Sequence, residues 1–241
     1  GYSMKKTLNF AGIPVEITWN SGGHFPCFFP FETEERPLLS VALSGEEVRA
    51  AKALYPDDPP DAYVEYMELC SRVSDALLPY ARVVFHGVAF LWHGRAWIFT
   101  APSGTGKTTQ YIRWKQRYGD EIGMMNGDKP ILEFRDREIW VHPSPWTGKE
   151  SMGRQVSAPL GGIVLLEQSG ENRLCRLTPQ AAAGELFVQF LFSRATAEDV
   201  QMVSRMEEQL LTQVPVWRFL NRGDDFSAQI CHDGLEMEAQ L

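Results

Sequence analysis

The stretch that decides the fold is residues 95–118, which read RAWIFTAPSGTGKTTQYIRWKQRY. An apolar run at 95–100 is followed by the glycine-rich segment 101–106, and helical spacing begins at about residue 106. The apolar run predicts a strand, and the residues after the glycines predict a helix. A strand, a glycine-rich loop and a helix in this order are typical of an α/β fold.

Segment 101–109 has the composition of a phosphate-binding loop of the Walker A type. Its glycines let the backbone curl so that successive N–H groups point at phosphate oxygens, and the helix N-terminus adds partial positive charge. Lys107 brings a positive charge to the β- and γ-phosphates, and Thr108 offers a hydroxyl to Mg²⁺. We therefore predict a nucleotide site made of Ser103, Gly104, Thr105, Gly106, Lys107, Thr108 and Thr109.

The segment departs from the usual pattern at its first position, where Ala101 replaces glycine. We predict that Ala101 avoids a positive φ, which alanine rarely adopts. The alternative interpretation is a glycine-rich turn from strand to helix in which Lys107 is merely exposed. The order of strand, loop, Gly-Lys-Thr and helix favours nucleotide binding.

From about residue 81 onward, patterns of strands and helices alternate. We predict strands at 83–92, 95–100, 123–125, 131–134, 138–142, 162–167 and 216–220, and helices at 106–118, 178–192 and 196–212. The polar residues after 220 predict a solvated tail that includes His232. The sequence therefore predicts a domain spanning 81–241 that holds the nucleotide site.

Residues 1–80 have a different character. Alternating apolar residues at 7–19 predict a short hairpin, and helical spacing predicts helices at 44–55 and 62–78. Pro79 ends the second helix. We place a domain boundary near residue 80, with residues 1–80 as a small α+β accessory region that recognises a substrate.

The charge and composition narrow the range of partners. With 31 acidic and 23 basic residues the net charge is −8, which disfavours binding to nucleic acid or to an anionic membrane. The four cysteines are far apart, which favours reduced thiols, and no apolar run is long enough to span a membrane. These observations predict a cytoplasmic protein with neither nucleic acid nor membrane as a partner.

A second motif lies upstream of the loop, at His86-Gly87-Val88. Together with the hairpin and strand that follow and with segment 103–108, it resembles the C-terminal catalytic domain of HPr serine kinase/phosphorylase, over about residues 81–220. The loop is equally similar to that of ATP-dependent phosphoenolpyruvate carboxykinase. The resemblance implies a P-loop-containing mixed sheet with flanking helices, and ATP and Mg²⁺ as cofactors.

In those families, paired aspartates follow the strand after the loop helix, where they bind metal and accept a proton. This chain has Asn126-Gly127-Asp128 there, so one carboxylate remains. The resemblance implies that Asp128 is essential, as a ligand of Mg²⁺, as a base toward a substrate hydroxyl, or as both. The alternative interpretation is a turn aspartate.

The resemblance also implies that His86 lies beside the catalytic carboxylate and the transferred phosphate. The alternative is a histidine satisfied within the core. The segment 142–154 reads as a binding loop, in which Lys149 and Arg154 can neutralise a phosphate during transfer. Its alternative is a proline-rich surface loop with solvated charges.

These motifs favour an ATP- and Mg²⁺-dependent kinase that transfers phosphate to a hydroxyl on a protein, a peptide or a small molecule. Residues 1–80 are the natural candidate for acceptor recognition. Two alternatives stay open, namely a carboxykinase-like enzyme and a nucleotide-binding regulator whose catalysis has decayed. Members of the resembling family are often oligomers, which allows a homo-oligomer here without fixing its stoichiometry.

Overall fold

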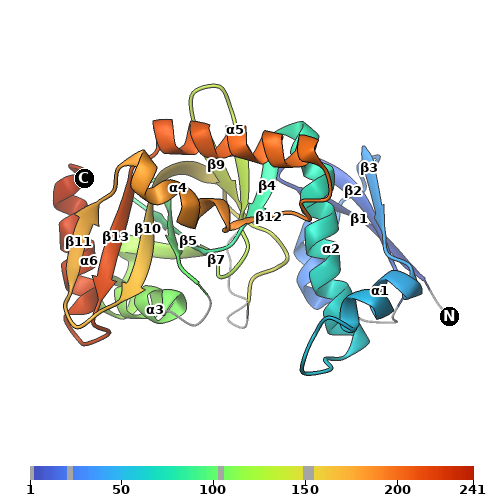
Figure 1. Ribbon diagram of the computed structural model, residues 1–241, viewed down its shortest axis with the longest axis horizontal. Helices are drawn as coiled ribbons and strands as arrows, with labels where there is room; N and C mark the ends of the chain where they lie inside the picture. Colours follow the sequence, from blue (N-terminus) through green and yellow to red (C-terminus); the bar gives the residue numbers. More distant parts are fainter. Residues whose placement is uncertain (1–2, 21–23, 103–105, 149–154) are drawn as a thin grey trace.

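The computed structural model describes residues 3–20, 24–102, 106–148 and 155–241. Two lobes lie side by side, with the N-terminus on the smaller lobe and the C-terminus at the far end of the larger one (Figure 1). The larger lobe carries the strand at Arg95–Thr100 and the helix at Lys107–Tyr118, and helix α2 (Asp61–Leu77) of the smaller lobe stands against it.

The smaller lobe is a sheet covered by two helices. Strand β2 pairs antiparallel with β1 and parallel with β3, which confirms the predicted hairpin, and Ala11-Gly12 form its turn. The elements are β1 (Met4–Phe10), β2 (Ile13–Trp19), the short helix η1 (Pro26–Phe31), β3 (Leu39–Ala42), α1 (Gly45–Lys52) and α2 (Asp61–Leu77). A capping box between Ser44 and Glu47 starts α1, and both predicted helices are confirmed.

The core of the smaller lobe continues into the larger one. Trp19, Phe28 and the buried face of α2 pack in one cluster with Val84, Ile131 and Trp146 of the larger lobe. The two lobes therefore share apolar contacts across the chain segment near residue 80. The domain boundary at that point stays a prediction.

A large mixed sheet forms the second lobe. Within the described residues, its strands run in the order β12-β4-β8-β9-β10-β6-β5-β7, with β13 beside β10 and β11 beside β13. The strands are β4 (Arg82–Phe85), β5 (Val88–Trp92), β6 (Arg95–Thr100), β7 (Ile122–Asn126), β8 (Ile131–Phe134), β9 (Ile139–His142), β10 (Ala158–Gln168), β11 (Arg173–Arg176), β12 (Phe190–Leu191) and β13 (Val216–Asn221).

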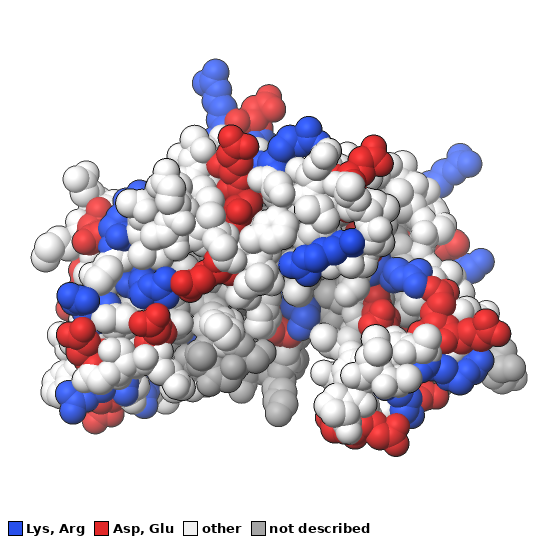
Figure 2. Space-filling view, in the orientation of Figure 1, with Lys and Arg blue, Asp and Glu red and all other residues white. Residues whose placement is uncertain are grey.

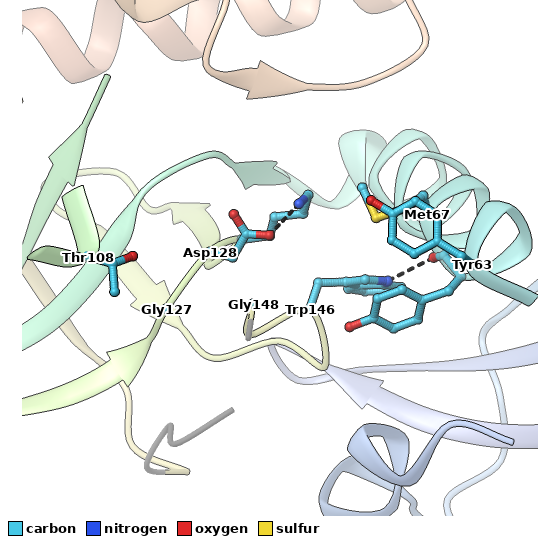
Figure 3. Close-up of a pocket in the computed structure, with 9 residues that line it drawn as sticks. Tyr63, Met67, Thr108, Gly127, Asp128, Trp146 and Gly148 are labelled. Atoms are coloured by element: carbon cyan, nitrogen blue, oxygen red, sulfur yellow. Dashed lines mark hydrogen bonds and ion pairs between the residues drawn. The ribbon is translucent and has the colours of Figure 1, made fainter. Parts of the chain in front are cut away.

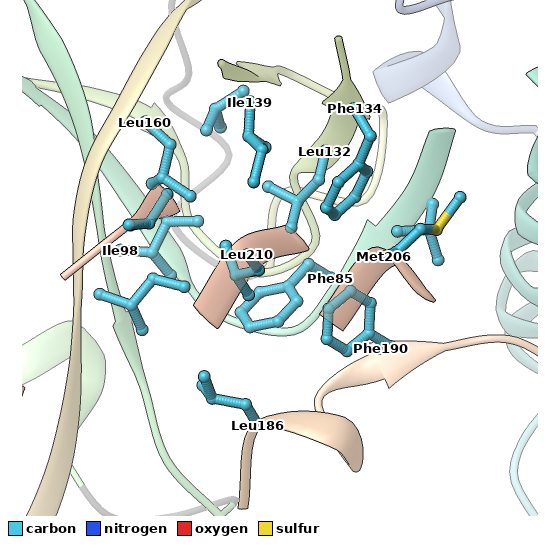
Figure 4. Close-up of a cluster of buried hydrophobic side chains, with 14 of the residues drawn as sticks. Phe85, Ile98, Leu132, Phe134, Ile139, Leu160, Leu186, Phe190, Met206 and Leu210 are labelled. Atoms are coloured by element: carbon cyan, nitrogen blue, oxygen red, sulfur yellow. The ribbon is translucent and has the colours of Figure 1, made fainter. Parts of the chain in front are cut away.

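Helices bury both faces of this sheet. In β6, Ala96 and Ile98 point into one core, whereas Trp97 and Phe99 point into the other, as the alternation of a strand requires. Helices α4 (Pro179–Phe187) and α5 (Ala197–Gln213) cover the first face, whose core is shown in Figure 4. Helices α3 (Lys107–Tyr118) and α6 (Ser227–Glu238) cover the second. The predicted α/β fold with a mixed sheet and flanking helices is confirmed.

The surface charges and the helix lengths can be compared with the expectation that the protein binds neither nucleic acid nor a membrane. On the face seen in Figure 2, basic and acidic side chains of the described residues are interspersed, and they form no broad basic area there. Among the described residues, no helix combines the length and the apolar character that crossing a membrane requires.

The predicted single strand at 83–92 is wrong. Strand β4 ends at Phe85 and β5 begins at Val88, because β4 pairs with β8 and β12 while β5 pairs with β6 and β7. His86 and Gly87 form the crossing between these two parts of the sheet. Local alternation cannot reveal that the neighbours change at this point.

Two predictions near the C-terminus are also wrong. The helix predicted at 178–192 ends at Phe187, because Phe190–Leu191 pair with β4 as a short strand. The tail predicted to be solvated contains α6, whose buried residues are spaced as one face of a helix, namely Ala228, Cys231, His232 and Leu235. His232 is 4% exposed and stacks on Tyr118, with a centroid separation of 3.5 Å.

We predict that Gly87→Ala destabilises the protein, because the new Cβ would lie 2.6 Å from Ile98 Cγ2 and 2.9 Å from the Phe99 carbonyl oxygen. Overpacking of this kind costs about 1–3 kcal/mol. Gly184→Ala is the matched control, since open space surrounds that exposed position within α4 and alanine favours helix. Thermal unfolding of both variants measures the difference, and equal melting temperatures would contradict the close approach at Gly87.

Candidate functional site

A cleft of about 570 Å³ lies between the start of α3, the end of β7 and helix α2 (Figure 3). Its walls come from both lobes. The lining residues are Tyr63, Tyr66, Met67, Thr108, Gly127, Asp128, Lys129, Trp146 and Gly148. The cleft therefore joins the start of α3, the predicted carboxylate and the smaller lobe in one site.

The turn after β7 carries the carboxylate. The buried side chain of Asn126 accepts hydrogen bonds at Oδ1 from the backbone N–H groups of Asp128 (3.0 Å) and Lys129 (2.7 Å). Its Nδ2 donates to the Ser144 carbonyl oxygen at 3.0 Å. An asparagine that bonds its own backbone two residues on is typical of such turns. Asn126 thus fixes the direction in which Asp128 leaves the strand.

Asp128 has a basic group at each carboxylate oxygen. His86 Nε2 lies 3.4 Å from Oδ1, and Lys129 Nζ lies 2.5 Å from Oδ2. Burial alone would raise the pKa of Asp128, but the hydrogen bond from His86 and the charge of Lys129 together outweigh it and lower that pKa. Asp128 is therefore ionised at neutral pH.

His86 is held in place from the other side. Its backbone N–H donates to the Gln189 carbonyl oxygen at 2.8 Å, and its Nδ1 lies 3.2 Å from Gln189 Oε1. Thr100 Oγ1 donates to the His86 carbonyl oxygen at 2.7 Å. Nδ1 thus faces Gln189 and Nε2 faces Asp128, so the imidazole lies between these two side chains. Gln189, the residue before β12 (Phe190–Leu191), thus holds His86 in place.

Lys107 and Thr108 open helix α3 at the same cleft. Gly106 precedes them with φ +88°, and Lys107 Nζ donates to the Ala101 carbonyl oxygen at 3.3 Å. Burial lowers the pKa of Lys107, an effect that the charge of Asp128 opposes and that of Lys129 reinforces. Ala101 is buried and has no positive φ, as predicted. Thr108 lines the cleft, whereas Thr109 is exposed beside it.

Gly127 has no room for a side chain. A Cβ at this position would lie 2.6 Å from the carbonyl oxygen of Thr147. The segment before Gly148 therefore occupies the space that a second carboxylate would need. The packing around Gly127 therefore agrees with the presence of one aspartate, Asp128, in this turn.

The site contains oxygen donors suited to Mg²⁺. The hydroxyl of Thr108 and the ionised carboxylate of Asp128 line the same cleft, and hard oxygen ligands are those that Mg²⁺ prefers. These two residues fit the predicted metal. Ser103, Gly104, Thr105, Lys149 and Arg154, which the sequence also predicts for this site, lie outside the described residues.

Sequence reasoning missed several lining residues. Lys129 directly follows Asp128 in the sequence, and this adjacency could have marked it as a site residue. The aromatic wall of Tyr63, Tyr66 and Trp146 had no local signal, because its members come from both lobes. Tyr66 Oη donates to the Pro145 carbonyl oxygen at 3.1 Å, and Trp146 Nε1 donates to the Tyr66 carbonyl oxygen at 2.9 Å. These bonds tie α2 to the segment after β9.

Known proteins show only a distant structural similarity to this chain. No protein-family model matches the sequence, and no curated protein matches it either. Among solved structures, the chain is similar to the HPr(Ser) kinase/phosphatase from Coxiella burnetii, with 10% sequence identity and a TM-score of 0.37, over 65% of this chain and 93% of that one. A likeness of this degree assigns neither a family nor an activity.

We predict that Gly127→Asp, which would supply a second carboxylate, lowers the melting temperature instead of improving the site. The added side chain would collide with the Thr147 carbonyl oxygen and displace the segment that closes the cleft. Differential scanning fluorimetry measures the effect, with Asp136→Asn as an exposed control in the turn between β8 and β9. A melting temperature equal to that of the parent protein would contradict the packing described for Gly127.

Proposed function

We propose that the protein is an ATP- and Mg²⁺-dependent kinase that transfers the γ-phosphate to a hydroxyl of a protein, a peptide or a small molecule. One observation carries the proposal. Thr108, at the start of α3, lines the same cleft as Asp128, which His86 contacts, and the charge of Asp128 acts on the neighbouring Lys107. A nucleotide site and a carboxylate–imidazole pair in one cleft are the parts that phosphoryl transfer needs.

Each residue has a role in this proposal. The helix N-terminus and Lys107 bind the phosphates, together with Ser103, Gly104, Thr105, Gly106 and Thr109. Thr108 and Asp128 would hold Mg²⁺, which neutralises charge on the phosphates when it is bound. Lys149 and Arg154 are proposed as further contacts to the phosphate during transfer. The chemistry then depends mainly on positioning and on neutralising charge.

Asp128 and His86 handle the proton of the acceptor. The low pKa of Asp128 keeps it ionised, so that it can accept a hydrogen bond from the acceptor hydroxyl and orient that oxygen. His86 Nε2, held 3.4 Å from the same carboxylate, can share the proton as it is released. Gln189 keeps the imidazole in the orientation that this role requires.

The smaller lobe supplies the wall of the cleft that lies opposite the start of α3. Tyr63, Tyr66 and Met67 of α2 form that wall together with Trp146. Tyr63 is 49% exposed, so its ring is open to a ligand that enters the cleft. We propose that this wall receives the acceptor, which gives residues 1–80 their recognition role.

We predict that Lys107→Ala weakens ATP binding by about 10- to 100-fold, because a charge-assisted contact to phosphate is lost. Isothermal titration with ATP measures the affinity. Lys115→Ala is the matched control, since Lys115 lies at the other end of α3 and its Nζ donates to the carbonyl oxygens of Gly119 and Ile122. An unchanged affinity in Lys107→Ala would refute the phosphate-binding role of this loop.

We predict that Asp128→Asn lowers phosphoryl transfer by about 10²-fold or more, since a general base typically contributes at least that factor. Labelled ATP and Mg²⁺ are incubated with the protein and fractionated cell extract, and labelled acceptors are counted. The Asp136→Asn variant serves as the control. Transfer at the parental rate in Asp128→Asn would refute the proposed role, and tight ATP binding by the parent protein without any turnover would instead support the regulator.

A further inference from the structure

Lys129 is a partly buried cation that lines the cleft, beside the only carboxylate among the lining residues. Its side chain is 12% exposed, whereas lysines are almost never buried unless they are paired. Its ammonium group lies 2.5 Å from Asp128 Oδ2, and the residue lines the same cleft as Thr108. A lysine in this position costs desolvation energy that a surface lysine would not.

The backbone of Lys129 is fixed at every polar atom. Its N–H donates to Asn126 Oδ1 at 2.7 Å and to the Trp146 carbonyl oxygen at 3.1 Å. Its carbonyl oxygen accepts from Ser144 Oγ at 2.5 Å. A group held in this way is preorganised, so little ordering is needed when a ligand binds beside it.

The local charges leave room for an anion. The ammonium group of Lys129 pairs with Asp128 Oδ2 at 2.5 Å, and the charges of both groups act on the ammonium group of Lys107 at the start of α3. One carboxylate balances one of the two cations. The remaining positive charge lies in a half-buried cleft, where an oxyanion such as a phosphoryl group is stabilised more strongly than in bulk water.

We infer that Lys129 is a catalytic residue that contacts the phosphoryl group during transfer and lets the site work with a single carboxylate. The inference rests on the proposed kinase function. During the step, the acceptor oxygen forms a bond to the γ-phosphorus while the bond to the bridging oxygen breaks. ADP leaves with that electron pair, and the acceptor proton passes to Asp128. Lys129 keeps its proton and neutralises charge on the transferring oxygens.

The packing around Gly127 explains why a cation is needed here. A second carboxylate, which would bring in further metal charge, has no space against the Thr147 carbonyl oxygen. Lys129 lies two residues further along the same turn and places its charge at Asp128 Oδ2. The turn therefore supplies a fixed positive charge in place of a second metal-binding group.

The test uses the full chain with Lys129→Met, which keeps the length of the side chain but removes the charge, and Lys129→Arg, which keeps the charge. Lys5→Met, an exposed lysine on β1, is the control. Three quantities are measured, namely the affinity for MgATP, the single-turnover rate of transfer, and the affinity for MgADP with aluminium fluoride, which mimics the transferring group. Circular dichroism checks that each variant is folded.

We expect Lys129→Met to lower the transfer rate by about 10²-fold, as the loss of one preorganised charge stabiliser does. The affinity for MgADP with aluminium fluoride should fall in parallel, whereas the MgATP affinity should hardly change. Lys129→Arg should recover part of both losses.

Two results would overturn the assignment while the kinase proposal stands. One is an unchanged transfer rate in Lys129→Met. The other is an equal loss of affinity for MgATP and for the aluminium fluoride complex, which would make Lys129 a residue that binds the ground state as strongly as the transferring group. A parent protein that binds MgATP but transfers nothing would overturn the kinase proposal and this role with it.

Discussion

The site depends on the buried amide of Asn126. Through it, the end of β7 is bonded to the N–H groups of Asp128 and Lys129 and to the carbonyl oxygen of Ser144. A buried polar group that loses its partner costs about 1–3 kcal/mol, so these contacts hold the turn and the segment after β9 together. The same amide thus fixes the carboxylate, its neighbouring cation and one edge of the cleft.

A change of strand neighbours brings His86 to this turn. Strand β4 ends in one part of the sheet and β5 begins in another, and the Gly87 N–H donates to the Asp128 carbonyl oxygen at 2.9 Å where they cross. The close approach of Ile98 and Phe99 leaves space only for glycine at this crossing. The divergence of β4 and β5 therefore brings His86 next to Asp128. The contact between His86 Nε2 and Asp128 Oδ1 is a consequence of this backbone arrangement.

Trp146 couples the smaller lobe to the same site. Its ring stacks on Phe10, with centroids 5.7 Å apart, and its Nε1 donates to the carbonyl oxygen of Tyr66 on α2. Its carbonyl oxygen accepts from the Lys129 N–H. A displacement of α2 would disturb both the aromatic wall and the turn that carries Lys129. The proposed acceptor side and the proposed catalytic turn are thus parts of one packed unit.

The sequence by itself determined the strand at 95–100 and the helix that follows it at 107–118, the hairpin at 7–19 and both N-terminal helices, because alternation, caps and glycines act over a few neighbouring residues. It also singled out Asp128 and His86, through a resemblance. Only the tertiary structure decided that Lys129 pairs with Asp128 in the cleft, that α2 forms a wall of the cleft, and that α6 covers the sheet. Those features arise from packing between distant segments, which local patterns do not encode.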